Sequence, residues 1–339
     1  MNVTRLRGAI GARTRRWLLS RGYLVQHLTP DEVRYMRSWS DGAAPDVDGG
    51  AAPRRDDPRL AELERRYRAV PWPVSEHTRW ADRSFIDFAR FRGDSLYMWH
   101  YRESPRVSAF KYFTYLRYVE DRDEKGWLAA LGEDGAFGCW TFEFPGRAAV
   151  SRDLLDSVNE LSFLERTLHL SGWDGLRVLD IGAGYGRLAH RAAQAFPGLR
   201  DWCCVDAVAE STYLCDHYLG YRGVVPPARV VELPDVPSLA PGAFDIAVNV
   251  HAFSECSRAA VAWWAELLAR LGVERLFVVP NEAEGFLTLE ADGSRRDYLG
   301  LLEAAGYGLI ADEYAFEDPA VRQLLGVHDR YCLFERTGQ

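Results

Sequence analysis

The sequence predicts an α/β protein with a doubly wound parallel sheet and a mainly helical N-terminal region. After residue 146, seven apolar runs of strand length alternate with segments of helical spacing, as in a Rossmann-like sheet. A glycine-rich turn lies where the first run gives way to a helix, and before residue 146 the chain is rich in aromatic residues. We therefore expect a helical N-terminal region at 1–145 and a sheet domain at 146–339.

The N-terminal region is divided by a segment of loop composition. Residues 39–60 are rich in Gly, Ala, Pro and Asp, which predicts a mobile loop. Helical spacing resumes at Leu60 and continues to Tyr67, and prolines at 71 and 73 then stop it. The aromatic-dense stretch from Trp80 to Phe144 predicts a packed helical core or a wall for a ring-shaped ligand.

The sheet domain begins with a capped helix. Ser151 is a typical N-cap, Asp153 follows in the first turn, and apolar residues recur at three- and four-residue steps up to Leu168. Strands are then expected at 176–181, 201–206, 228–233, 244–250, 275–280, 307–316 and 329–336. Helices are expected at 186–196, 209–219, 258–271 and 297–305.

The turn V-L-D-I-G-A-G-Y-G-R at 178–187 is the strongest indication of a ligand site. Glycines at 182, 184 and 186 allow positive φ and a close approach of a ligand to the backbone. A dinucleotide site normally has G-x-G-x-x-G, with pyrophosphate at the helix N-terminus. Here the spacing is G-x-G-x-G, and Asp180 would repel a pyrophosphate but could accept loop N–H groups or bind a cationic ligand.

This turn resembles motif I of the class I S-adenosylmethionine-dependent methyltransferases, close to D-x-G-x-G-x-G. The resemblance implies S-adenosylmethionine as methyl donor and S-adenosylhomocysteine as product. Asp206, about 24 residues after the first glycine, ends the second strand where Rossmann-like folds place a ribose-binding carboxylate. The final two strands fit the antiparallel pair that closes the methyltransferase sheet. The predicted cofactor-binding residues are Asp180, Gly182, Ala183, Gly184, Gly186, Arg187, Asp206, Ala207 and Asn249.

A candidate base follows the fourth strand. A sugar or alcohol hydroxyl attacks a sulfonium methyl poorly unless a base takes its proton. We expect His251 to be this base and Glu255, four residues later, to orient its imidazole if the segment is helical. His190 and His217 are interpreted as packing or surface residues. The pair His328 and Asp329 could line the acceptor side, although a turn is favoured.

Four segments extend the resemblance to the sugar O-methyltransferases of actinobacterial natural-product clusters. They are residues 151–164, 178–188, 249–255 and 278–282, and the resemblance covers about 95–336. It implies a deoxysugar hydroxyl of a natural product or its precursor as acceptor. Acceptor contacts are expected in the aromatic region before the turn, at Tyr97, Trp99, His100 and Tyr101. The first 80 residues match no motif and could form a lid or a homo-oligomer contact.

Composition excludes several other classes of partner. A net charge of −8 and a pI near 5.6 argue against a general nucleic-acid surface. The six cysteines are scattered without zinc-ligand spacing, which favours free thiols in a reducing cytoplasm. No segment approaches the length of a membrane span or has the pattern of a signal peptide, so we expect a cytoplasmic protein.

Three alternative functions follow from the same residues. An NAD-dependent oxidoreductase needs a different glycine spacing and usually a Tyr-x-x-x-Lys pair, but the only lysines are Lys111 and Lys125. A magnesium-dependent methyltransferase acting on another hydroxyl would have only Glu255, Asn281 and Glu282 as scattered ligands, so metal-free transfer is favoured. A cofactor-binding partner without catalysis is disfavoured by Asp180, Asp206 and His251.

Overall fold

The fold is seen in a computed structural model of the 339-residue chain. Its described residues are 52–71, 73–74, 78–84, 86–93, 105–281 and 285–337, with single positions at 14, 17, 20, 21 and 30. Contacts divide the chain into two compact units, residues 1–43 with 98–110 and residues 44–97 with 111–339. The second unit contains the sheet, and the boundary expected at 145 lies inside this unit.

Seven strands form one mixed sheet, which confirms the predicted fold class. Their order is β3-β2-β1-β4-β5-β7-β6. The five strands from β3 to β5 are parallel, whereas β7 runs antiparallel to both of its neighbours. The strands are β1 (Leu176–Ile181), β2 (Leu199–Val205), β3 (Ala228–Val230), β4 (Ile246–Val250), β5 (Arg275–Val279), β6 (Tyr307–Tyr314) and β7 (Arg330–Arg336).

The register brings the carboxyl ends of three strands together. Ile181 at the end of β1 pairs with Val205 at the end of β2, and Asp180 pairs with Val248 of β4. The chain leaves β1 toward β2 on one side and reaches β4 on the other, so a switch point lies beside β1. Ligands of doubly wound sheets bind at such a point. The glycine turn, Asp206 and His251 all follow strands that end there.

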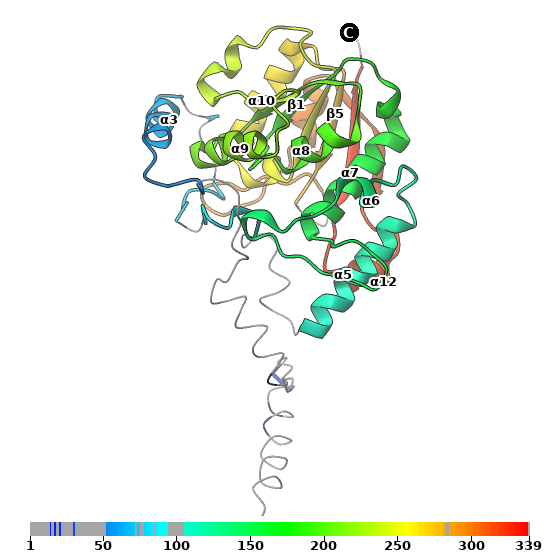
Figure 1. Cartoon of the computed structure of the whole chain (residues 1–339). Coiled ribbons are helices and arrows are strands. Elements are labelled where there is room, and N and C mark those ends of the chain that lie inside the picture. The colour runs from blue at the N-terminus through cyan, green and yellow to red at the C-terminus, as the bar shows by residue number, and fades with distance from the viewer. Residues whose placement is uncertain are drawn as a thin grey trace, which may run out of the picture. The chain divides into compact units, whose positions relative to one another are not determined.

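Helices flank the sheet, with α8 and α9 in front of it in Figure 1. The helices of the sheet region are α7 (Arg152–Leu168), α8 (Arg187–Ala195), α9 (Ala209–Tyr221), α10 (Arg258–Leu271), α11 (Leu299–Ala304) and α12 (Pro319–Leu325). Short 3₁₀ turns are η4 (Leu170–Gly172), η5 (Leu233–Ser238) and η6 (Ala252–Glu255). The helix α12 fills part of the long connection expected between the last two strands.

Local sequence signals explain where the helices begin. The Oγ atom of Ser151 accepts a hydrogen bond from the backbone N–H of Leu154, so Ser151 caps α7 as predicted. Ser257 caps α10 in the same way through Ala260. The predicted strand 228–233 ends early, at Val230, because Pro234 and Pro237 lack the N–H that a strand would use and the chain turns into η5.

The described part of residues 1–145 contains helices joined by irregular segments. Its helices are α3 (Pro58–Arg68), α5 (Pro105–Glu120) and α6 (Trp127–Leu131), with 3₁₀ turns η1 (Phe91–Gly93) and η3 (Ala136–Gly138). The helix α3 begins two residues before the predicted start, because Asp57 accepts the backbone N–H of Arg59 and Pro58 fills the first turn. The expected loop therefore ends before residue 58, and its residues 39–51 lie outside the described part of the chain.

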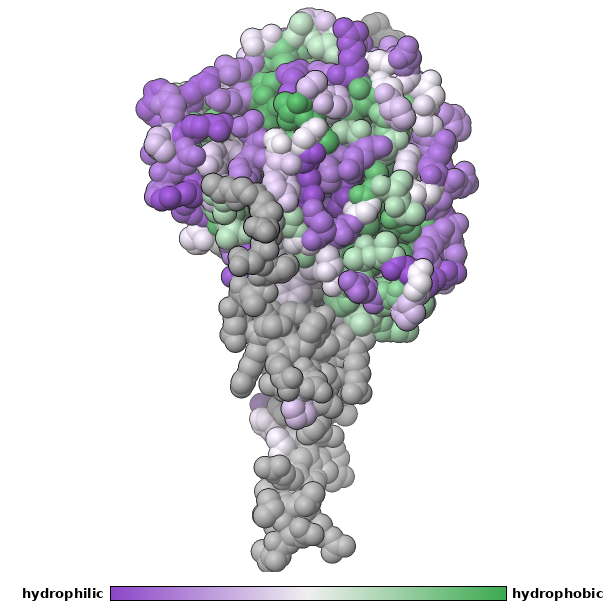
Figure 2. All heavy atoms as spheres, in the orientation of Figure 1, coloured by the Kyte–Doolittle hydropathy of each residue, from purple (hydrophilic) through white to green (hydrophobic). Residues whose placement is uncertain are grey.

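The surface of the sheet unit is mixed in character. Figure 2 shows hydrophilic and hydrophobic residues interspersed over one face. Among the helices whose residues the structure describes, none combines the length and the apolar character that a bilayer crossing requires.

Candidate functional site

The glycine turn has the backbone that its sequence predicts. Gly182, Gly184 and Gly186 have φ values of 77°, 58° and 84°. Residues other than glycine rarely adopt this backbone conformation. The N–H of Gly182 donates to the carbonyl oxygen of Val205 at 2.8 Å, and that of Ala183 donates to the same oxygen at 3.1 Å. These two hydrogen bonds therefore hold the turn at the end of β2.

The three glycines differ in what a side chain would meet. A Cβ atom on Gly182 would lie 2.2 Å from the Cβ of Ala252, and one on Gly186 would lie 2.9 Å from the Sγ of Cys215. A Cβ on Gly184 would have no heavy atom within 4 Å. Gly182 and Gly186 thus permit close packing within the protein, whereas Gly184 faces open space where a ligand can contact the backbone.

We expect alanine at Gly184 and at Gly182 to separate these two roles. Both changes place a Cβ at positive φ, which costs about 1–2 kcal/mol. The resemblance to motif I implies that the turn binds S-adenosylhomocysteine, and on that expectation the Gly184→Ala protein should fold and bind this ligand at least about tenfold more weakly than the unmodified protein. The Gly182→Ala protein should lose more folding stability because of the clash with Ala252. Thermal unfolding and calorimetric titration measure both effects, and unchanged affinity in Gly184→Ala would exclude this face from ligand binding.

Two buried carboxylates flank the turn. Asp206 accepts the N–H groups of Gly184 at 2.9 Å and Val208 at 2.8 Å, and burial raises its pKa to about 6. Asp180 accepts the indole N–H of Trp202 at 3.0 Å, and burial raises its pKa to about 7. Of the two roles considered for Asp180, bonding to loop N–H groups or to a cationic ligand, the first is not seen among the described residues, where Trp202 of β2 bonds this carboxylate.

Among the described residues neither of these carboxylates forms an ion pair within 4 Å, although the charge of Arg187 acts on Asp180 from a distance. A buried negative charge is costly unless a cation or hydrogen bonds compensate it. The turn therefore favours a ligand with hydroxyl donors and positive charge and disfavours a pyrophosphate.

A buried ion network, which no motif in the sequence indicates, also supports the turn. The hydroxyl of Tyr185 donates to Asp153 at 2.6 Å, and Asp153 also pairs with Arg191 at 2.9 Å and with Arg92 at 3.2 Å. The carboxylate of Glu133 pairs with both arginines at 3.0 and 2.8 Å. Only the position of Tyr185 between two glycines of the turn could have suggested such an anchor.

Two of the predicted cofactor-binding residues, Asn249 and Arg187, form hydrogen bonds with other residues of the protein. Asn249 is 0% exposed; its amide donates to the carbonyl of Ile181 at 2.9 Å and accepts the N–H of Phe253 at 3.0 Å. Arg187 forms two hydrogen bonds of 2.9 Å with Glu160 of α7 and one of 2.8 Å with Ser157. We correct the prediction for Asn249, because no part of its side chain is exposed to a ligand. Ala207 lies directly after Asp206, at the same sheet edge.

His251 lies at the end of β4 in a strained turn. Its φ is 67°, its N–H donates to the carbonyl of Val279 at 2.8 Å, and its Nε2 atom lies 3.4 Å from Oδ1 of Asp329. Burial lowers the pKa of His251, but the carboxylate of Asp329 outweighs it, so the pKa is raised overall. The side chain expected to form a turn with His328 is therefore the partner of the candidate base.

Glu255 does not orient His251 as predicted. The segment after His251 is the 3₁₀ turn η6, so residues four apart do not lie above one another as in an α-helix. The Oε2 atom of Glu255 accepts the indole N–H of Trp80 at 2.7 Å, and its main-chain carbonyl accepts the N–H of Arg79 at 3.0 Å. The sequence did not indicate this contact with the N-terminal region.

Residues 78–84 connect the two sides of the sheet edge. Trp80 bonds to Glu255 after β4, and Arg83 pairs at 2.9 Å with Glu210 at the start of α9, after β2. Because β1 lies between β2 and β4, this segment spans the edge at which the glycine turn lies. The N-terminal region thus contributes to the candidate site.

Several other predicted site residues lie outside the described part of the chain. Tyr97, Trp99, His100 and Tyr101 lie outside the described residues, as does Glu282. Within the described ranges no group of three His, Cys, Asp or Glu side chains could hold a metal ion. The amide of Asn281 lies 3.4 Å from Glu255. His190 is buried and bonds Tyr218 at 3.1 Å, which agrees with a packing role.

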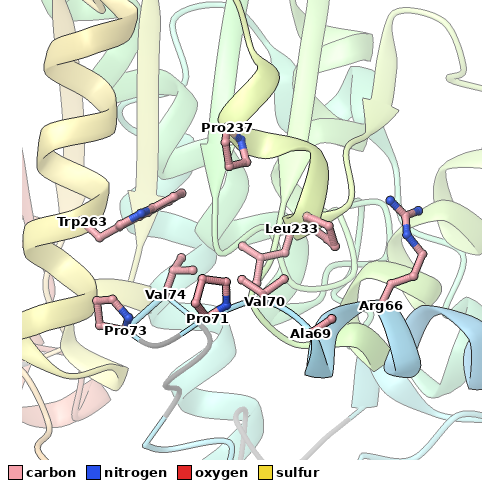
Figure 3. Close-up of a pocket in the computed structure, with 10 residues that line it drawn as sticks. Arg66, Ala69, Val70, Pro71, Pro73, Val74, Leu233, Pro237 and Trp263 are labelled. Carbon is pink, nitrogen blue, oxygen red and sulfur yellow. The ribbon is translucent and has the colours of Figure 1, made fainter.

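A separate apolar pocket of about 290 Å³ lies at the C-terminal end of α3 (Figure 3). Across it, Leu233 and Pro237 of η5 and Trp263 of α10 face Val70, Pro71, Pro73 and Val74. None of the predicted cofactor-binding or catalytic residues lines this pocket. It is therefore distinct from the glycine turn.

No protein-family model matches the chain, and no curated protein sequence matches it. Similar solved structures include the [4+2]-cyclase SpnF, with 16% identity and a TM-score of 0.43 over 69% of this chain and 97% of that one. Another is the magnesium protoporphyrin IX methyltransferase ChlM from Synechocystis PCC 6803, determined with bound SAM. It has 13% identity and a TM-score of 0.40 over 66% of this chain and 97% of that one.

Proposed function

We propose that this chain is an S-adenosylmethionine-dependent O-methyltransferase that acts on a sugar hydroxyl of a small molecule. The observation that carries the proposal is the open face of Gly184 between Asp206 and Asp180, two buried carboxylates that form no ion pair among the described residues. A nucleoside with ribose hydroxyls and a positive charge fits such a site, whereas two phosphates do not.

The residues of the turn have distinct tasks in this proposal. Asp206 accepts hydrogen bonds from the ribose hydroxyls with lone pairs that the N–H groups of Gly184 and Val208 leave unused. The backbone at Gly184 lies against the ligand. When bound, the cofactor supplies an electrophilic methyl carbon, whose bond to sulfur breaks with its electron pair left on sulfur as the acceptor oxygen attacks.

His251 takes the proton of the acceptor hydroxyl. It follows β4 at the carboxyl edge of the sheet, where Asp206 follows β2. A base here is needed because a neutral sugar hydroxyl is a weak nucleophile. The choice of a sugar, on a natural product or its precursor, rests on the resemblance of residues 151–164, 178–188, 249–255 and 278–282 to sugar O-methyltransferases.

Ligand-induced stabilisation tests the choice of cofactor. S-adenosylhomocysteine at 100 times its dissociation constant should stabilise the protein by about 2.7 kcal/mol, measured by thermal unfolding. NAD at the same concentration should give no shift. Stabilisation by NAD and not by S-adenosylhomocysteine would replace this proposal by the oxidoreductase alternative. Product analysis with labelled donor and candidate glycosides, with and without a chelator, then tests the acceptor and the metal-free route.

A further inference from the structure

The two ring nitrogens of His251 lie in different surroundings. The Nε2 atom is shielded from solvent and lies 3.4 Å from Oδ1 of Asp329. The side chain as a whole is nevertheless 34% exposed, so its exposed part lies away from Nε2. Among the described residues Nδ1 has no hydrogen-bond partner. One nitrogen therefore faces a carboxylate inside the protein, and the other remains available to a ligand.

Asp329 is held in place by its own backbone and by positive charge. It lies between α12 and β7, and its carbonyl oxygen accepts the N–H of Ala315 at 2.8 Å. Burial raises the pKa of Asp329, but His251, Arg152 and Arg187 outweigh this and lower it overall. Asp329 therefore stays ionised at neutral pH and can accept a hydrogen bond but not donate one.

We propose that Asp329 is a positioning residue that keeps a proton on Nε2 of His251 and thereby makes Nδ1 the atom that receives the proton of the acceptor hydroxyl. The second half of this statement rests on the proposed function; the first half concerns the ligand-free protein alone. During the reaction the hydroxyl proton moves to Nδ1 while the oxygen would bond to the methyl carbon, whose bond to sulfur would break with its electron pair left on sulfur. The imidazolium that forms has Asp329 beside it to offset its charge.

The groups around His251 determine its pH dependence. Asp329 just before β7, Glu255 of η6 and Glu160 of α7 all act on the imidazole and raise its pKa. Only the neutral imidazole can take a proton, so kcat should rise with pH through this raised pKa. Removing the charge of Asp329 lowers the pKa, and the acid limb of the profile should move to lower pH.

The test begins with nitrogen NMR of the ligand-free protein, labelled at histidine. We expect a protonated Nε2, an unprotonated Nδ1 and a pKa above 6.5 in the unmodified protein. In Asp329→Asn the pKa should fall and the second tautomer should appear. Protonated Nδ1 in the unmodified protein, or an unchanged pKa in Asp329→Asn, would overturn the proposal. These measurements do not depend on methyl transfer, so they stand even if the proposed function fails.

Kinetics test the catalytic half. Asp329→Asn should lower kcat by at least about tenfold, with a smaller change in KM and in affinity for S-adenosylhomocysteine. Asp329→Glu, which keeps the charge, should recover part of the loss. Asp312→Asn is the matched control, because Asp312 lies on the neighbouring strand β6 and pairs with Arg330 rather than with His251. Equal losses in Asp329→Asn and Asp312→Asn would contradict a specific role for Asp329.

Discussion

Replacing His251 with alanine is expected to lower turnover by about 10²- to 10⁴-fold, the usual loss when a general base is removed. Binding of S-adenosylhomocysteine should change little, because the glycine turn and Asp206 are held by β2 rather than by His251. The measurement is kcat with a glycoside that product analysis has identified, together with calorimetric titration of S-adenosylhomocysteine.

A control substitution of another histidine distinguishes loss of the general base from a general loss of folded structure. His169 is exposed at the C-terminal cap of α7 with φ of 54°, a conformation that asparagine tolerates. His169→Asn should therefore keep nearly full activity. Turnover in His251→Ala within about threefold of the unmodified protein would remove His251 from the role of base. Loss of S-adenosylhomocysteine binding in the same variant would show instead that His251 supports the donor site.

The parts of the site that the sequence predicted are local in the chain. The glycine turn, its positive φ values and the position of Asp206 follow from residues adjacent to strands, whose carboxyl ends meet in any doubly wound sheet. The antiparallel strand near the end of the sheet was expected from the resemblance to class I methyltransferases, and β7 has this direction. For the glycine turn and Asp206 spacing was sufficient, because each depends on one strand and the residues directly after it.

The partners of these residues could not be predicted in the same way. Glu255 was predicted to orient His251 on the assumption of α-helical spacing. However, η6 is a 3₁₀ turn, and the carboxylate of Glu255 accepts a hydrogen bond from Trp80. Asp329 reaches His251 because β7 inserts between β5 and β6, a contact set by strand order and not by spacing. Such pairs depend on side-chain direction across elements, which one sequence does not specify.

Replacing Asp153 with asparagine is expected to lower the free energy of unfolding by about 3–5 kcal/mol. Asp153 and Glu133 are the two fully buried carboxylates that pair with Arg92 and Arg191, which are themselves buried. Asparagine has nearly the same size, so packing changes little, but two guanidinium groups then share one buried carboxylate. Because arginine is too basic to lose its proton, both guanidinium groups stay charged, and the cost of their desolvation is no longer fully compensated.

Denaturant unfolding measures this loss, with Asp216→Asn as the control. Asp216 pairs with Arg59 on the surface, where both side chains are more than half exposed, so its removal should cost at most about 1 kcal/mol. Tyr185→Phe separates the network from the turn, because it removes only the hydroxyl that joins Asp153 to the glycine loop. We expect Tyr185→Phe to weaken S-adenosylhomocysteine binding more than folding. If Asp153→Asn proved no more destabilising than Asp216→Asn, the buried network would not be what holds the turn, and the backbone bonds to Val205 would have to suffice.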